Sequence, residues 1–211
     1  MKALLYKDWI TYRFSYLLLL GMILLVLLFG PLFKLNLEFL LGWSASIVII
    51  GAVAGGMAGQ TTDMKSHVDR YVQAVPLRKS VIVLEKFLWN WAIALLATGL
   101  VAAALLVPRI EAPVWLIAAA CLFGMTFFSS LMTPSAYLLG PDMAFIPYAV
   151  VFMLFGLGAT GLAKSGILNE EFFASLSDKT DAITIGFLVA TVALNAASFF
   201  VTQAIYRRKV N

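Results

Sequence analysis

Six long stretches without a charged side chain constrain this sequence more than any other feature. The chain has 211 residues, and its 26 charged side chains would interrupt every helix if they were evenly spread. A helix needs about 20 apolar residues to cross the hydrocarbon core of a bilayer. With 62% hydrophobic and 12% charged residues, the composition excludes an ordinary soluble domain. We predict one all-α integral membrane domain over 1–211, with six transmembrane helices at 14–33, 39–60, 87–108, 114–133, 143–163 and 182–206.

The fourth uncharged run, 112–141, is too long for one helix. Proline lacks the amide hydrogen that a helix interior needs, and glycine and proline together favour turns. We therefore expect Pro134, Gly140 and Pro141 to break the end of this run, so that the span stops near Thr133. A short connection around 134–142 then leads to the fifth span.

The distribution of basic residues predicts the orientation. Six spans put both termini on one side, and that side collects 11 of the 15 lysines and arginines. Loops rich in these residues stay in the cytoplasm. We therefore predict cytoplasmic N- and C-termini, with a net charge of +6 on the inner side and −2 on the outer side. The overall charge of +4 is explained by topology, so it is no argument for nucleic-acid binding.

The sequence offers no catalytic site, metal site or nucleotide site of its own. It contains one histidine, His67, and one cysteine, Cys121, and no phosphate-binding glycine loop. No Asp, Glu, Lys, Arg or His lies deep within a predicted span, although ion-coupled carriers usually need one there. Any energy for transport must therefore come from another protein.

Residues 1–13 carry aromatic and apolar side chains at helical spacing, including Trp9 and Tyr12. This pattern is typical of a helix that lies in the headgroup region. Two interpretations remain open: an elbow helix that turns into the first span, or an ordinary anchored terminus. At the other end of the chain, residues 164–181 are too apolar for a fully solvated loop, and we expect an external segment that caps the bundle or re-enters the outer leaflet.

Residues 62–75 form the most informative segment between spans. Apolar positions such as Met64, Val68 and Tyr71 recur at helical spacing, and charged residues lie between them. Pro76 then interrupts the pattern. The segment is predicted to be a short amphipathic helix on the cytoplasmic side. A soluble partner could grip it and move the adjoining spans, or it could simply shield the bundle.

Within the spans, small and amide side chains stand out. Gly51, Gly55 and Gly59 form two overlapping GxxxG patterns that favour close helix packing, either inside the subunit or against another one. Asn90 and Asn195 can form hydrogen bonds between helices or contact a substrate. Asp142 is the one charge in its connection, and it either meets a cytoplasmic partner or marks the membrane interface.

Two local motifs resemble the permease subunits of ABC-2 type exporters, particularly the small bacterial ones. The opening Met1 to Asp8 reads MKALLYKD, with the Lys-Asp pair of that family. The second motif runs from Asp63 to Lys86, with an acidic-basic helix, a turn at Val75 to Lys79 and a lysine that opens the third span. Here Val75 replaces the leucine that usually precedes the proline.

The resemblance implies that 62–75 is the coupling helix between helices 2 and 3, which docks on a separate ATPase subunit. That ATPase would bind ATP and Mg²⁺, and two permease copies, identical or different, would form a dimer in the bacterial cytoplasmic membrane. The residues implied at the ATPase-coupling interface are Asp63, Met64, Lys65, Val68, Asp69, Arg70, Tyr71, Val75, Pro76, Arg78 and Asp142.

An uncharged interior rich in phenylalanine and methionine suits amphipathic cargo, such as antimicrobial or cytolytic peptides, drugs or lipids. The expected lining residues are Asn90, Phe152, Met153 and Phe155, although bulky apolar groups can equally face lipid. Two other functions stay open: a membrane anchor or sensor that recruits a cytoplasmic partner without transport, and an energy-independent channel or scramblase. An ATPase gene beside this one would favour the exporter.

Overall fold

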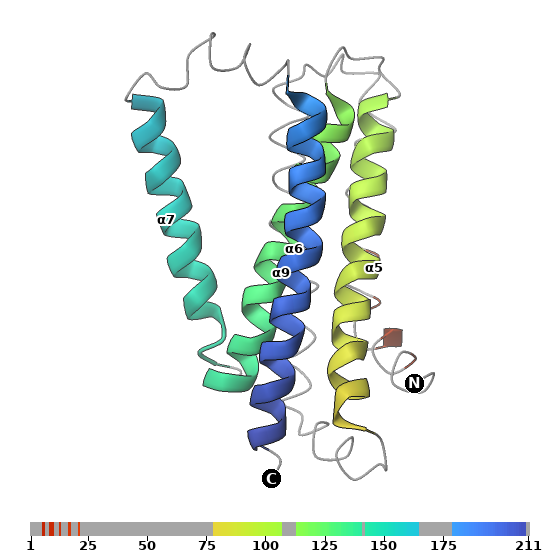
Figure 1. Ribbon diagram of the computed structural model, residues 1–211, viewed down its shortest axis with the longest axis vertical. Coiled ribbons are helices and arrows are strands. Elements are labelled where there is room, and N and C mark those ends of the chain that lie inside the picture. Colours follow the sequence, from red (N-terminus) through yellow and green to blue (C-terminus); the bar gives the residue numbers. More distant parts are fainter. Residues whose placement is uncertain are drawn as a thin grey trace.

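The structure is a computed structural model in which four long helices are described (Figure 1). They are α5 (Lys79–Leu106), α6 (Val114–Leu139), α7 (Phe145–Lys164) and α9 (Thr180–Lys209). The described residues are 78–106, 113–140, 142–164 and 179–209, together with Tyr6, Trp9, Ile10, Arg13, Leu17 and Gly21. No strand occurs among these residues, so the all-α prediction is confirmed for this part of the chain.

Three of the described helices can cross a membrane by length and composition. They lie at Lys79–Ala103, Val114–Leu139 and Thr180–Arg208. The predicted spans 14–33 and 39–60 lie outside the described residues, so the total of six spans stays a prediction. The coupling segment 62–75 and most of the external segment 164–181 also lie outside. Of the predicted elbow helix, Tyr6, Trp9, Ile10 and Arg13 are described as helical and exposed.

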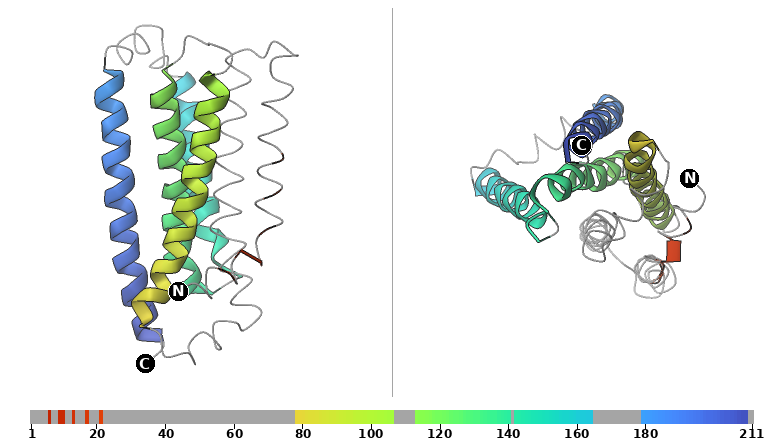
Figure 2. Two further views of the ribbon diagram at one scale, coloured as in Figure 1. Left: turned by 90° about the vertical axis from the view of Figure 1, so that its right-hand side faces the viewer. Right: turned by 90° about the horizontal axis from the view of Figure 1, so that it is seen from below.

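Successive helices alternate in direction, so α6 and α9 run opposite to α5 and α7 (Figure 1). Seen from below, α6 lies at the centre, with α5, α7 and α9 around it (Figure 2). It contacts all three neighbours, most extensively α9, and α5 also contacts α9. The helix α7 packs against α6 and leans away from α9 toward its Lys164 end.

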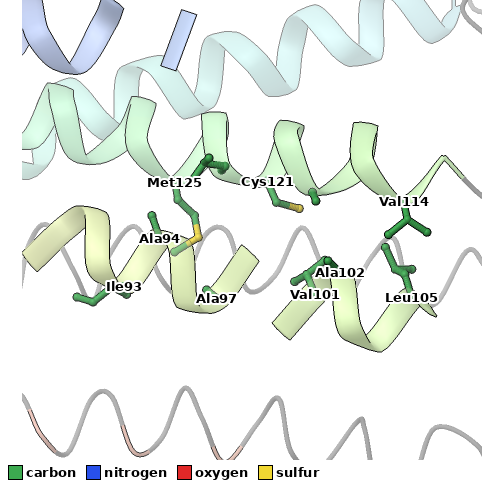
Figure 3. Packing of buried hydrophobic residues seen from close by; sticks show 11 residues of the cluster. Ile93, Ala94, Ala97, Val101, Ala102, Leu105, Val114, Cys121 and Met125 are labelled. Carbon is green, nitrogen blue, oxygen red and sulfur yellow. The ribbon is translucent and has the colours of Figure 1, made fainter. Parts of the chain in front are cut away.

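Between α5 and α6 lies a core of small and medium side chains, seen from close by in Figure 3. Ala94 and Ala97 bring the two backbones close together, while Met125 and Leu105 fill the remaining space. Small residues favour such contacts in membranes, where the hydrophobic effect between helices is absent. A second core joins α5, α6 and α9 near the start of α5, and its buried members are Ile82, Val83, Phe87, Tyr137 and Tyr206.

Two helix boundaries differ from the sequence-based predictions by more than a turn. The helix α6 does not stop at Thr133 but continues through Pro134 to Leu139, because a proline bends a membrane helix without ending it where neighbours satisfy the freed carbonyl. The helix α5 begins at Lys79, eight residues before the predicted start at Phe87. Glu85 and Lys86 are therefore part of the helix and do not precede it.

The connection between α6 and α7 is a tight turn at Gly140. This residue has a φ of +89°, which side chains rarely allow, and its amide donates to the Ala136 carbonyl at 3.1 Å. The Ala144 amide in turn donates to the Gly140 carbonyl at 3.1 Å. Gly140, predicted as a breaker, is thus the residue that ends α6.

Candidate functional site

One end of the bundle gathers those of the described charged residues that the sequence assigned to the cytoplasm. The start of α5, the turn between α6 and α7 and the end of α9 all lie at this end (Figure 1). Arg78 precedes α5, Asp142 lies in the turn, and Arg207 and Arg208 are in the last turn of α9; all four are exposed. The structure therefore brings Arg78 and Asp142, two predicted coupling residues, to the same end of the bundle.

The other predicted coupling residues lie outside the described residues, as do the packing glycines. The last of these coupling residues, Pro76, lies three residues before the start of α5 at Lys79. The coupling residues concerned are Asp63, Met64, Lys65, Val68, Asp69, Arg70, Tyr71, Val75 and Pro76, and the glycines are Gly51, Gly55 and Gly59.

A buried ion pair lies two turns into α5. Lys86 Nζ is 3.7 Å from Glu85 Oε2, and the side chains are only 7% and 1% exposed. A helix of 28 residues is about 42 Å long and so exceeds the hydrocarbon core of about 30 Å, which leaves length for end turns at the membrane interface. The predicted third span, 87–108, begins directly after these two charges. In the structure both are buried inside the protein.

Small buried polar residues recur along α6 and α9, two helices that pack extensively on each other. On each helix they recur every three or four positions, which puts them on one face. All of them are buried: Thr126, Ser129, Ser130 and Thr133 on α6, and Thr191, Asn195, Ser198 and Thr202 on α9. We call these eight residues the polar seam. Sequence analysis noted only Asn195 among them, although the spacing along α9 is visible in the sequence.

Most hydroxyl groups of the polar seam donate within their own helix. Thr126 Oγ1 donates to the Leu122 carbonyl at 2.8 Å, and Thr202 Oγ1 donates to the Ser198 carbonyl at 2.7 Å. Ser198 Oγ is different, because it crosses to α6 and donates to the Ser130 carbonyl at 2.6 Å. Buried polar groups in a membrane need such partners, since no water is present to replace them.

Asn195 and Asn90 each have one buried side-chain polar atom without a hydrogen-bond partner among the described residues. Asn195 Nδ2 donates to the Thr191 carbonyl in its own helix at 2.9 Å, whereas its Oδ1 has no partner among the described residues. Asn90 is 6% exposed, and its Nδ2 likewise lacks a partner within the described part of the chain. It shares a helical face with Ala94 and Ala97, which pack in the α5–α6 core.

Aromatic pairs hold the bundle above and below the polar seam. Phe123 of α6 and Phe187 of α9 have ring centroids 5.4 Å apart near one end. Near the other end, Tyr137 of α6 meets Tyr206 of α9 edge to face at 5.3 Å. A T-shaped arrangement at this distance is favourable because the edge of one ring meets the face of the other. An aromatic pair between α6 and α9 thus flanks the polar seam at each end.

The remaining predicted cargo residues lie on α7. Met153 is 66% exposed, and Leu154 and Leu157 beside it are exposed as well. Phe152 and Phe155 belong to the same helix, but their side chains lie outside the described residues. The helix is attached to α6 at its first turns, where Tyr148 packs edge to face on Phe128 at 5.0 Å. The described side chains in its middle turns present an apolar surface.

A model of the ABC-2 family of transporter proteins matches residues 3–207. The chain belongs to this family. The match extends over nearly the whole sequence, which confirms the family resemblance of the two motifs. Membrane subunits of the ABC-2 family generally lack catalytic groups and work with an ATPase subunit. No curated protein and no solved structure matches the chain.

Proposed function

We propose that this protein is the transmembrane permease subunit of an ATP-binding cassette exporter in the bacterial cytoplasmic membrane. It moves amphipathic cargo, such as antimicrobial or cytolytic peptides, drugs or lipids. The observation that carries the proposal is the family match over residues 3–207, supported by the long apolar helices of the described region. ATP and Mg²⁺ bind to a separate ATPase subunit, because this sequence has no phosphate-binding loop.

The helix packing offers a route by which an ATPase could drive the permease. In the proposal, the coupling helix 62–75 docks on the ATPase together with Arg78 and Asp142. Movement of that segment passes into α5, which begins at Lys79 and packs against both α6 and α9. Two permease copies and two ATPases assemble, and nucleotide binding closes the ATPase pair. The cargo path runs along the side chains of Asn90, Phe152, Met153 and Phe155.

Coupling is tested by capturing the ATPase with the purified permease and measuring ATP-dependent uptake of a fluorescent amphipathic peptide into inverted membrane vesicles. The double variant Asp69→Ala/Arg70→Ala is expected to lose ATPase capture and at least 10-fold of the uptake rate, because both charges lie on the proposed docking helix. Asp181→Ala is the control, since this exposed acid lies in the first turn of α9, at the opposite end of the bundle.

Unchanged capture and uptake in the Asp69→Ala/Arg70→Ala variant would overturn the coupling role of 62–75. A permease that binds no ATPase at all, and takes up peptide equally well with and without ATP, would instead support the channel or scramblase.

A further inference from the structure

The proline within α6 leaves a backbone carbonyl without its usual helical donor. In an α-helix the amide of residue i donates to the carbonyl of residue i−4. Pro134 has no amide hydrogen, so it cannot donate to the Ser130 carbonyl. Ser130 is 4% exposed, and the carbonyl lies in a bundle where an unmade hydrogen bond is costly.

The hydroxyl of Ser198 meets this same carbonyl. Ser198 Oγ is 2.6 Å from the Ser130 carbonyl oxygen, which is short for a hydrogen bond between a hydroxyl and a carbonyl. Ser198 is itself buried, with 8% of its surface exposed. Four residues further along α9, Thr202 Oγ1 donates to the Ser198 carbonyl and is fully buried. The donor therefore stands in a part of α9 that is packed against α6.

We infer that Pro134 and Ser198 form a joint between α6 and α9, in which the α9 hydroxyl replaces the amide hydrogen that the proline removes. The joint has two effects. It lets α6 continue as a helix for five residues beyond Pro134, and it fixes the register of α9 against α6. The two features depend on each other: without Pro134 the carbonyl has its own helical donor, and the Ser198 hydroxyl is no longer needed.

This dependence can be measured with a four-variant cycle on the full-length permease purified in detergent micelles. Ser198→Ala is expected to lower the apparent Tm by about 2–6 °C, given the strength of hydrogen bonds between membrane helices and the size of the chain. Pro134→Ala restores the amide donor to Ser130. In that background Ser198→Ala is expected to lower Tm by less than half as much.

Two further variants separate the joint from a general loss of buried hydroxyl. Ser129→Ala is the matched control, because Ser129 is equally buried but donates within its own helix, to the Thr126 carbonyl at 3.1 Å. Its Tm is expected to stay closer to that of the unmodified protein than the Tm of Ser198→Ala does. Ser198→Thr keeps the hydroxyl, so its Tm is expected to lie closer to that of the unmodified protein than to that of Ser198→Ala.

The joint is overturned if Ser198→Ala and Ser129→Ala lower Tm equally, or if the loss from Ser198→Ala is undiminished beside Pro134→Ala. If Pro134→Ala does not fold, the comparison of Ser198→Ala, Ser198→Thr and Ser129→Ala decides alone. None of these measurements depends on the cargo or on the ATPase, so the joint and the proposed function can fail separately.

Discussion

The α6–α9 contact and the exposed surface of α7 differ in the kind of side chain that each presents. The polar seam comprises eight small buried polar side chains on two closely packed helices, and one of them, Ser198, donates across the contact. The helix α7 presents large apolar side chains outward in its middle turns, including Met153 and Leu157. Lipid tails are as apolar as leucine, so association in the membrane depends on packing and hydrogen bonds, not on burial of apolar area.

This contrast divides the described region into two parts. Helices α5, α6 and α9 form a unit that is held by small residues, aromatic pairs and buried polar groups. The helix α7 adds an apolar surface whose surroundings are supplied by lipid, by cargo or by another chain. Substitutions inside the three-helix unit should therefore reduce stability, whereas matched substitutions on α7 should leave the isolated chain almost unchanged.

The largest effect is expected at the buried ion pair of α5. Lys86→Met removes one partner of the buried Glu85 carboxylate, and the loss of a buried ion-pair partner costs up to about 3–5 kcal/mol. The measurement is the apparent Tm in detergent, with Arg208→Met as control because Arg208 is an exposed cation at the same end of the bundle. The double variant Glu85→Gln/Lys86→Met should recover stability. Equal Tm values for Lys86→Met and Arg208→Met would show that the pair contributes nothing.

A leucine pair compares the two parts directly. Leu105→Ala opens a cavity in the α5–α6 core, where the side chain is 1% exposed, and should cost about 2 kcal/mol, the low end for such changes because lipid weakens the transfer contribution. Leu157→Ala on α7, where the side chain is 72% exposed, should change stability by less than about 0.5 kcal/mol.

The same pair also sharpens the role of α7. Thermal unfolding and size-exclusion chromatography are run on both variants. If Leu157→Ala leaves the Tm unchanged but shifts the protein to a smaller assembly, the α7 surface is covered by another chain. If it lowers the Tm as much as Leu105→Ala does, the division into two parts is wrong.

The smallest effect is expected at the aromatic pair near the end of α9. Tyr206→Leu removes an edge-to-face contact with Tyr137 at 5.3 Å, which is worth about 0.5–1.5 kcal/mol beyond the buried area. A double-mutant cycle with Tyr137→Leu isolates that contribution in chemical unfolding. If the two single losses simply add, the rings contribute area alone, and the α6–α9 contact rests on the polar seam.

Much of the helical region could be predicted from the length of the uncharged runs, because a transmembrane helix requires about 20 apolar residues whatever their order. The errors have a common cause. Pro134 and Glu85 were interpreted from the local chain alone, whereas their roles depend on a neighbouring helix. A proline ends a helix only if nothing else satisfies the carbonyl it frees, and a charge at a span edge faces water only if no neighbouring helix buries it.

The candidate site shows the same limit. The count of basic residues predicts that Arg78 and Asp142 lie on the same side of the membrane, because charge sets topology. The polar seam could have been found from the spacing of Thr191, Asn195, Ser198 and Thr202. Its partner on α6 could not, because hydropathy treats serine and threonine as mildly unfavourable in a span and says nothing about which helix accepts their hydrogen bonds.

The turn at Gly140 has a geometric consequence for α7. It joins two helices through a few residues and so fixes their separation at one end only. With 20 residues α7 is about 30 Å long, and a tilt of 10° about this turn would carry its far end sideways by about 5 Å. A small rotation at the Gly140 end is thereby converted into a displacement the width of a side chain at the Lys164 end of α7.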